Sequence, residues 1–123
     1  MALKRFCNHL CPKFQLAMDV LAKPWNGLII ASLYDGEMRF SELVACLGGI
    51  GDRMLSARLK ELSARGLLER RVLDGPPVRV EYQLTDVGRG FHSVAEAIGQ
   101  WGKSLSDDTP KVRKRTTKAA RGY

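Results

Sequence analysis

The sequence has little of what most enzymes, disulfide-bonded proteins or membrane proteins need. It has two histidines, His9 and His92, without a partner at a useful spacing, and no glycine-rich phosphate loop or nucleophile–base motif. Its three cysteines are an odd number, which argues against a disulfide framework. The longest apolar run, at 28–31, is far shorter than the ~18 residues of a membrane span, and no secretory signal is visible. We therefore expect a cytoplasmic protein that is not an enzyme and binds no cofactor.

The net charge of +7 predicts a polyanionic partner, but the charge is unevenly distributed. From Lys103 onward, seven basic and two acidic residues account for +5 of it. Residues 1–102 carry only +2, which alone does not identify a nucleic-acid-binding protein. The segment 105–123 is polar, basic and without an apolar period, so we expect a disordered tail. The chain then divides into an N-terminal arm at 1–10, one folded domain at 11–104 and the basic tail at 105–123.

Hydrophobic periodicity predicts a chain of helices interrupted by one β-hairpin. The expected elements are helices at 12–22, 25–34, 41–47, 52–64 and 86–104, a short extended piece at 38–40, and strands at 67–73 and 78–84. Ser41, Asp52 and Thr85 are the expected N-caps of the last three helices. Gly66 is the expected stop of the helix at 52–64.

Two short helices joined by the tight turn Gly48-Gly49-Ile50-Gly51, and followed directly by a hairpin, are typical of the winged helix-turn-helix. We therefore expect a mainly α fold with a small β-hairpin (α+β). In this fold the second helix of the pair enters the major groove of DNA, while the hairpin tip reaches the neighbouring backbone or minor groove. The order of elements thus predicts double-stranded DNA as the partner and a nucleoid-associated location.

The candidate DNA contacts lie mainly opposite the leucine face of the helix at 52–64. Leu55, Leu59 and Leu62 recur at i, i+4 and i+7 and should face the core. The opposite face carries Arg53, Ser56, Ala57 and Lys60, with Arg58 at its border. Arg53 is suited to the two acceptors of a guanine edge, Ser56 to a base or phosphate, and Lys60 to a phosphate.

Two further arginines lie outside this helix. Arg79 follows the hairpin tip Pro76-Pro77, a position from which it could enter a minor groove. Arg39 precedes the third helix and is a candidate phosphate contact. Arg70 and Arg71 point to opposite faces of one strand, so we expect at most one of them to meet DNA.

The chain also resembles a known family along most of its length, roughly residues 11–102. The motifs that carry the resemblance are Cys11-Pro12, Trp25, Arg39-Phe40-Ser41-Glu42-Leu43, Ile50, Arg53-Met54-Leu55-Ser56, Leu59-Lys60-Glu61-Leu62, Gly66-Leu67-Leu68-Glu69-Arg70, Pro77-Val78-Arg79-Val80-Glu81-Tyr82-Gln83-Leu84-Thr85, Gly88 and Trp101-Gly102. They closely resemble the HxlR family of MarR-like winged-helix regulators. The chain departs from that family at Ala22-Lys23-Pro24-Trp25, where Gly-Gly-Lys-Trp is usual, and at Asp52, where Gln or Lys is common. Two interpretations of Asp52 stay open: an acid that biases base choice toward a cytosine donor, or the cap of the helix, which we prefer.

The resemblance implies a transcription regulator, with repression preferred over activation, that forms a homodimer through its first and last helices. The sequence agrees, because Phe91, Val94, Ile98 and Trp101 form an apolar stripe larger than so small a core can bury. Two-fold symmetry would require a palindromic operator with half-sites about one helical turn apart.

The family also includes regulators whose cysteine at the position of Cys11 senses quinones, aldehydes or oxidants. The start of a helix and the nearby Lys13 would favour a thiolate at Cys11, with Cys7 as a resolving partner. The alternative, a small buried residue at a helix start, stays open. Cys46 is expected to be inert core. Cys7, His9 and Cys11 lack a second pair of ligands, so we predict no metal site.

Two other kinds of partner fit parts of the sequence. A winged-helix protein–protein interaction module without sequence-specific DNA binding is the main alternative. Arg39, Arg53 and Arg79 favour DNA over it, since a scaffold has no need of cations on those surfaces. RNA binding would suit the tail, but the domain lacks exposed aromatic side chains suited to stacking on bases.

Overall fold

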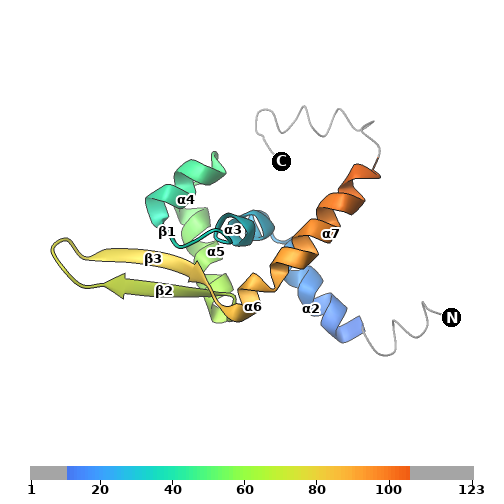
Figure 1. Ribbon diagram of the computed structural model, residues 1–123, viewed down its shortest axis with the longest axis horizontal. Coiled ribbons are helices and arrows are strands. Elements are labelled where there is room, and N and C mark those ends of the chain that lie inside the picture. The colour runs from blue at the N-terminus through green and yellow to red at the C-terminus, as the bar shows by residue number, and fades with distance from the viewer. Residues whose placement is uncertain (1–10, 106–123) are drawn as a thin grey trace.

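The computed structural model describes residues 11–105 of the 123-residue chain. Its elements are α2 (Cys11–Ala22), α3 (Asn26–Ser32), β1 (Met38–Arg39), α4 (Phe40–Leu47), α5 (Asp52–Ala64), β2 (Leu68–Leu73), β3 (Arg79–Leu84), α6 (Asp86–Arg89) and α7 (Phe91–Lys103). A helical centre of α3, α4 and α5 lies between two projections: the β2–β3 hairpin on one side, and α2 with α7 on the other (Figure 1). The arm at 1–10 and the tail beyond residue 105 lie outside the described residues, so the proposed domain limits stay a prediction.

The hydrophobic core forms where α3, α4, α5 and the sheet meet. Its buried side chains are Ile29, Ile30, Leu33, Leu43, Ile50, Leu55, Leu59, Leu62, Leu68 and Leu84. The three leucines of α5 have relative exposures of 0%, 1% and 0%, which confirms the helical periodicity seen in the sequence. Because α3 packs against α2, α4 and α7, it is the central element.

Three antiparallel strands form the sheet, in the order β1-β3-β2. The hairpin expected from the sequence is present, with Leu68 opposite Leu84 and Leu73 opposite Arg79. The piece at 38–40 also joins the sheet, since Met38 pairs with Tyr82 and Arg39 with Glu81. Alternation along the strands puts Leu68 and Leu84 on the face that meets the core.

Of the three expected N-caps, one was right and two were wrong. Thr85 caps α6, because its Oγ1 accepts a hydrogen bond from the Gly88 N–H (3.1 Å). Ser41 does not cap α4: the N-cap is Arg39, whose N–H donates to Glu42 Oε1 (2.8 Å). Asp52 does not cap α5: Gly51 is the N-cap, and Asp52 lies in the first turn, where its charge complements the helix dipole.

Two helices also differ in extent from the expectation. The helix expected at 25–34 is shorter, because Trp25 is its N-cap in the left-handed region (φ 79°). The helix expected at 86–104 is divided at Gly90 into α6 and α7. In contrast, α5 ends as expected. Gly66 (φ 81°) donates to Ser63 O and Leu67 to Leu62 O, the Schellman arrangement.

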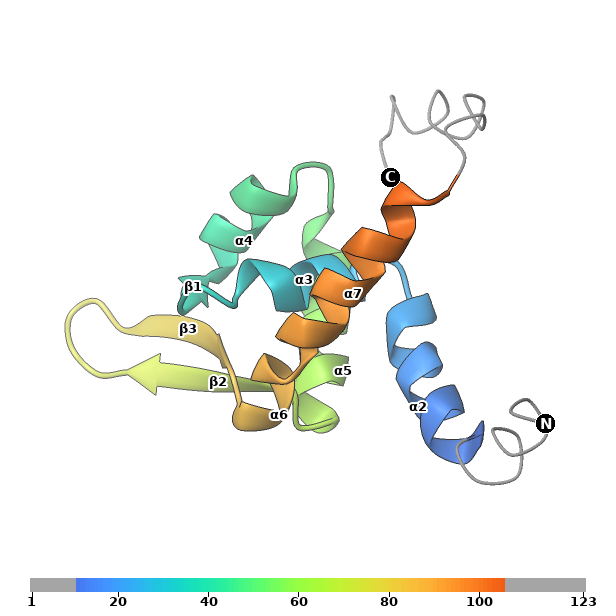
Figure 2. The same ribbon diagram turned by 45° about the vertical axis from the view of Figure 1, so that its right-hand side comes forward.

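Helices α2 and α7 carry large apolar side chains that are partly exposed to solvent. The exposed ones are Phe14, Leu16 and Met18 on α2, and Val94, Ile98 and Trp101 on α7. Both helices extend from the side of α3 opposite the hairpin (Figure 2). Neither they nor any other helix within 11–105 combines the length and apolar character needed to cross a bilayer.

Candidate nucleic-acid interface

The candidate surface on α5 is formed by the side of the helix that turns away from the core. Arg53, Ser56, Ala57 and Lys60 are all exposed there. Leu55, Leu59 and Leu62 anchor the opposite side, so their burial fixes the rotation of the helix about its axis. The helix therefore presents two cations, a hydroxyl and a methyl group to solvent along one face.

Arg58, at the border of this face in the sequence, is held away from it. Its side chain is only 14% exposed. Its Nε donates to the carbonyl oxygen of Pro24 (2.9 Å), and its Nη1 lies 3.7 Å from Glu61 Oε1. Sequence reasoning missed this role because the acceptor lies 34 residues away and is a backbone atom.

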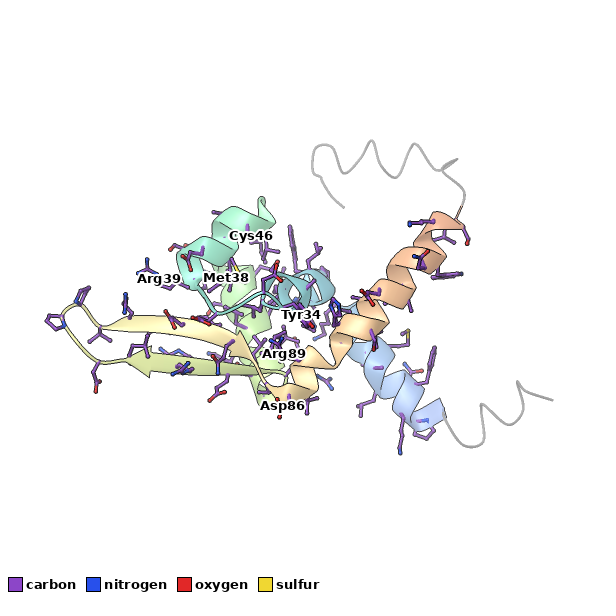
Figure 3. All side chains as sticks on the ribbon, viewed as in Figure 1. Tyr34, Met38, Arg39, Cys46, Asp86 and Arg89 are labelled. Atoms are coloured by element: carbon purple, nitrogen blue, oxygen red, sulfur yellow. The ribbon has the colours of Figure 1, made fainter. Side chains whose placement is uncertain are left out.

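The outward face of the sheet carries three arginines, Arg39, Arg71 and Arg79, and two acids, Glu69 and Glu81. The register places Arg39, Glu81 and Arg71 side by side across β1, β3 and β2, and Arg79 lies two residues before Glu81 on the same face. Arg71 Nη1 donates to Gln83 Oε1 (3.1 Å). Arg39 and Arg79 are exposed, and the Arg39 side chain extends away from the ribbon in Figure 3. Arg70, opposite Tyr82, lies on the other face.

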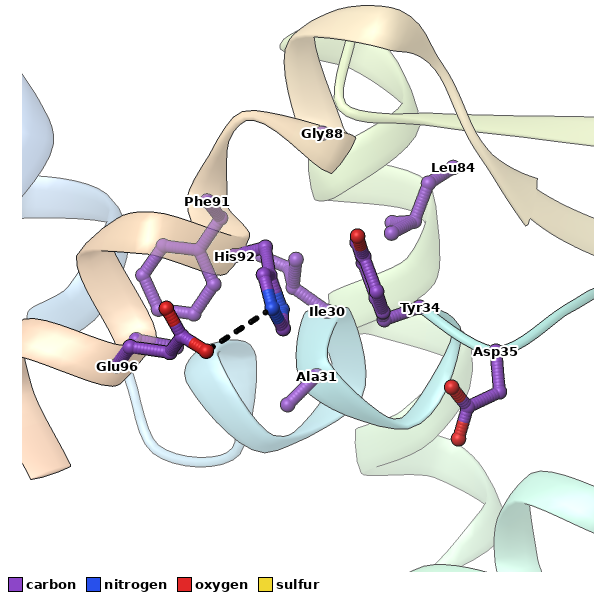
Figure 4. Close-up of a pocket in the computed structure, with 10 residues that line it drawn as sticks. Ile30, Ala31, Tyr34, Asp35, Leu84, Gly88, Phe91, His92 and Glu96 are labelled. Atoms are coloured by element: carbon purple, nitrogen blue, oxygen red, sulfur yellow. Dashed lines mark ion pairs between the residues drawn. The ribbon is translucent and has the colours of Figure 1, made fainter.

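A second cluster, absent from the sequence expectations, joins α3 to α7. The rings of Tyr34 and His92 stack with centroids 4.0 Å apart, and His92 Nε2 lies 3.3 Å from Glu96 Oε2 (Figure 4). The Arg89 guanidinium lies 4.6 Å from the centre of the Tyr34 ring. Tyr34, His92 and Glu96 border a cavity of about 330 Å³. The i, i+4 spacing of His92 and Glu96 was visible in the sequence, but the stacking on Tyr34 was not.

The three cysteines differ in how the structure bears on their expected positions. Cys11 is the first residue of α2, as expected for a helix start, whereas Cys7 lies outside the described residues. Cys46 was expected in the core, but it is exposed, with its Sγ 3.7 Å from Ser32 Oγ (Figure 3). The apolar pattern of α4 predicted a buried Cys46, but this helix buries only Leu43 fully in the core. Within 11–105, no group of three or more metal-ligating side chains comes together.

The helical pair α4–α5, its glycine turn and the three-stranded wing define a winged helix-turn-helix protein. The sequence profile of the HxlR-like helix-turn-helix family matches residues 20–110. The chain belongs to this family of transcription regulators, which confirms the resemblance found in the sequence.

Named relatives and solved structures agree with this assignment. The HTH-type transcriptional regulator YodB of Bacillus subtilis is 43% identical over 100 residues, covering 81% of this chain and 89% of YodB. YvaP of the same organism, also an HTH-type transcriptional regulator, is 41% identical over 81% of this chain and 93% of its own length. The structure of reduced B. subtilis YodB superposes with a TM-score of 0.75 at 40% identity, covering 79% of this chain and 95% of that one. The oxidised redox regulator HypR gives 0.70 at 34% identity, covering 77% and 98%. These relatives are regulators of transcription, not enzymes.

Proposed function

We propose that this protein is a sequence-specific regulator that binds double-stranded DNA as a homodimer and represses transcription. The observation that carries the proposal is the exposed face of α5, with Arg53 and Lys60 opposite three fully buried leucines. A helix held in this way can enter the ~12 Å major groove without disturbing the core. Membership in a family of helix-turn-helix regulators supports the same reading.

Each candidate residue has a separate role in this proposal. Arg53 pairs with a guanine edge, Ser56 and Ala57 contact bases or a phosphate nearby, and Lys60 contacts a phosphate. Arg79, at the start of β3, reaches from the wing into the minor groove, and Arg39 binds the backbone. Arg39 and Arg79 share one face of the sheet, so a single duplex can meet both.

The homodimer is supported by the apolar side chains that α2 and α7 leave exposed. Trp101 is 64% exposed and Leu16 is 58% exposed, although both are large apolar residues of helices. Pairing these helices with a second copy would bury them. A two-fold dimer would bind a palindromic operator with half-sites about one helical turn apart.

Thiol modification of Cys11 is the proposed signal. Cys11 begins α2, where the helix dipole favours a thiolate, and α2 is one of the two proposed dimer helices. The solved structures of YodB include a quinone-bound form and a diamide-treated form, and HypR is described as a redox regulator. A small electrophile or oxidant acting on Cys11, with Cys7 as a resolving thiol, would displace α2 and change DNA affinity.

Footprinting of the region upstream of the protein's own gene, followed by titration of the protected duplex, tests DNA binding. Arg53→Ala should weaken specific binding by about 5- to 150-fold, the value of one bidentate base contact. Arg79→Ala should lower the slope of log K against log salt by about 1. Arg65→Ala, at the exposed end of α5, is the matched control. Unchanged binding in both variants would refute the contacts, and absence of any protected site would favour the protein-interaction alternative.

The signal is tested by titrating the same duplex before and after treatment with diamide or a quinone. Wild type should change its DNA affinity on treatment, whereas Cys11→Ser should not. An identical response in the two proteins would exclude Cys11 as the sensor.

A further inference from the structure

The three residues between α2 and α3 contact both α5, the helix proposed to enter the major groove, and the turn that precedes it. Lys23 Nζ lies 3.2 Å from Glu61 Oε2, and the Pro24 carbonyl accepts the hydrogen bond from Arg58 Nε. The edge of the Trp25 ring lies over the glycine turn, so that a Cβ at Gly49 would be 4.0 Å from Trp25 Cη2. This α2–α3 junction, residues 23–25, thus holds α5 at its middle and just before its start.

Glu61 is the centre of the polar part of this contact. Its two carboxylate oxygens face Lys23 and Arg58 separately, and its side chain is only 23% exposed. Partial burial reduces the solvent screening of the pair with Arg58, whose side chain is 14% exposed, whereas the pair with Lys23, which is 48% exposed, stays screened and weak. The Arg58–Pro24 hydrogen bond adds a charged donor to a backbone acceptor, which is stronger than a bond between neutral groups.

The backbone of the junction is strained at one residue. Trp25 has a φ of 79°, which costs a non-glycine residue free energy and persists only where the surroundings fix it. The neighbours of Trp25 are bonded on both sides. Arg58 binds Pro24, and the fully buried Asn26 donates from Nδ2 to the Val20 carbonyl of α2 (2.8 Å). Trp25 therefore lies between Pro24, which is bonded to α5, and Asn26, which is bonded to α2.

We propose that Arg58 and Glu61 are positioning residues for DNA recognition. They fasten α5 to the α2–α3 junction, so that the angle at which α5 meets DNA depends on the position of α2. Arg58 thus acts through α5 and makes no contact with a phosphate. This inference rests on the proposed DNA-binding function.

Salt dependence separates positioning from direct contact. Specific affinity is measured on the footprinted duplex, and non-specific affinity on a random duplex of equal length. Arg58→Ala should weaken specific binding by about 2- to 30-fold, the range of coupling through a packed network. Its non-specific affinity and its salt slope should equal those of Arg65→Ala, a control that loses the same charge at the C-cap of the same helix. A salt slope about 1 lower than that of the control would overturn the proposal, because it would show a lost phosphate contact.

Glu61 provides a test in which charge and position predict opposite signs. Glu61→Ala removes a negative charge near DNA, so electrostatics alone predicts tighter binding. The positioning role predicts weaker specific binding, with partial recovery in Glu61→Gln, whose amide oxygen still accepts hydrogen bonds. Tighter specific binding by Glu61→Ala would contradict the proposal.

A DNA-free measurement tests the junction independently. The chain has two tryptophans, Trp25 and Trp101, which 5-fluorotryptophan labelling would report as two ¹⁹F resonances. The Trp25 resonance should move in both Arg58→Ala and Glu61→Ala and stay in place in Arg65→Ala. If the wild-type protein binds no DNA but the Trp25 resonance moves as expected in the two variants, the proposed function is refuted and the contact between the junction and α5 is still supported. A Trp25 resonance unmoved in both variants would overturn the positioning role.

Discussion

Replacement of Gly88 by alanine in α6, the short helix that follows the wing, is expected to be strongly destabilising. Gly88 is buried in α6, and a Cβ there would lie against the Leu67 carbonyl oxygen, well inside the 3.0 Å that real Cβ atoms keep. The same carbon would be 3.1 Å from Leu84 Cδ2 and 3.2 Å from Leu67 C. The Leu67 carbonyl cannot turn away freely, because it accepts a hydrogen bond from the Thr85 N–H (3.1 Å).

The expected cost follows from these contacts. Overpacking of a filled site costs about 1–3 kcal/mol, and the shift of α6 would also weaken the Thr85 cap, worth about 1 kcal/mol. Gly88→Ala should therefore lower the free energy of unfolding by roughly 3 kcal/mol. For a domain of this size that corresponds to a fall in melting temperature of roughly 10–25 °C.

Urea unfolding followed by far-ultraviolet circular dichroism, at one protein concentration throughout, measures this loss. Gly27→Ala is the matched control, because Gly27 lies in α3 and a Cβ there would meet only Leu21 Cδ2, at 4.0 Å. The control should be unchanged or more stable by up to about 1 kcal/mol, from the higher helix propensity of alanine. Equal midpoints for Gly88→Ala and Gly27→Ala would refute the steric argument.

Three further predictions concern the core, the corner after the wing and the exposed thiol. Leu59→Ala should lower the free energy of unfolding in urea by about 2–5 kcal/mol, since Leu59 is 1% exposed. Thr85→Val should lower the free energy of unfolding by about 1–2 kcal/mol in the same assay, because the Thr85 hydroxyl also donates to Gly66 O (2.6 Å). Thr85→Ser, which keeps the hydroxyl, should retain most of the wild-type stability. The Cys46 thiol should react with Ellman's reagent in the folded protein, and Cys46→Ser should change stability by less than about 0.5 kcal/mol. A protected Cys46 would contradict its exposed position.

The sequence correctly predicted those features that depend on residues close together in the chain. The leucines of α5 face the core because three side chains at helical spacing can be buried together only on one face. Gly66 ends α5 because the left-handed conformation suits glycine, and Thr85 starts α6 because its hydroxyl reaches an N–H three residues on. For the same reason the exposure of Arg53 and Lys60 was predictable from the position of the leucines.

The expectations failed where the cause lies far along the chain or where two local choices compete. Arg39 replaced Ser41 as the N-cap of α4 because Glu42 binds its N–H and β1 fixes its backbone beside β3. Trp25 adopts a left-handed conformation that no local preference favours, held in place by neighbours bonded to α5 and α2. The sequence placed Arg58 at the border of the outer face and could not show its partner, because the acceptor, Pro24, is distant in sequence.

Under the proposed function, in which α5 enters the major groove, the turn between α4 and α5 limits how this protein could acquire a new operator. Gly48 and Gly49 have φ values of 59° and 105°, so replacement of either by another residue would be strained even though Gly48 has open space around it. Single substitutions in the turn are therefore an unfavourable way to change the angle between α4 and α5. New sequence preferences would arise more readily by exchanging the side chains that α5 displays, which leaves its approach to the duplex unchanged. The backbone of the turn thus restricts which residues it can hold, whereas the exposed face of α5 can change its side chains without that restriction.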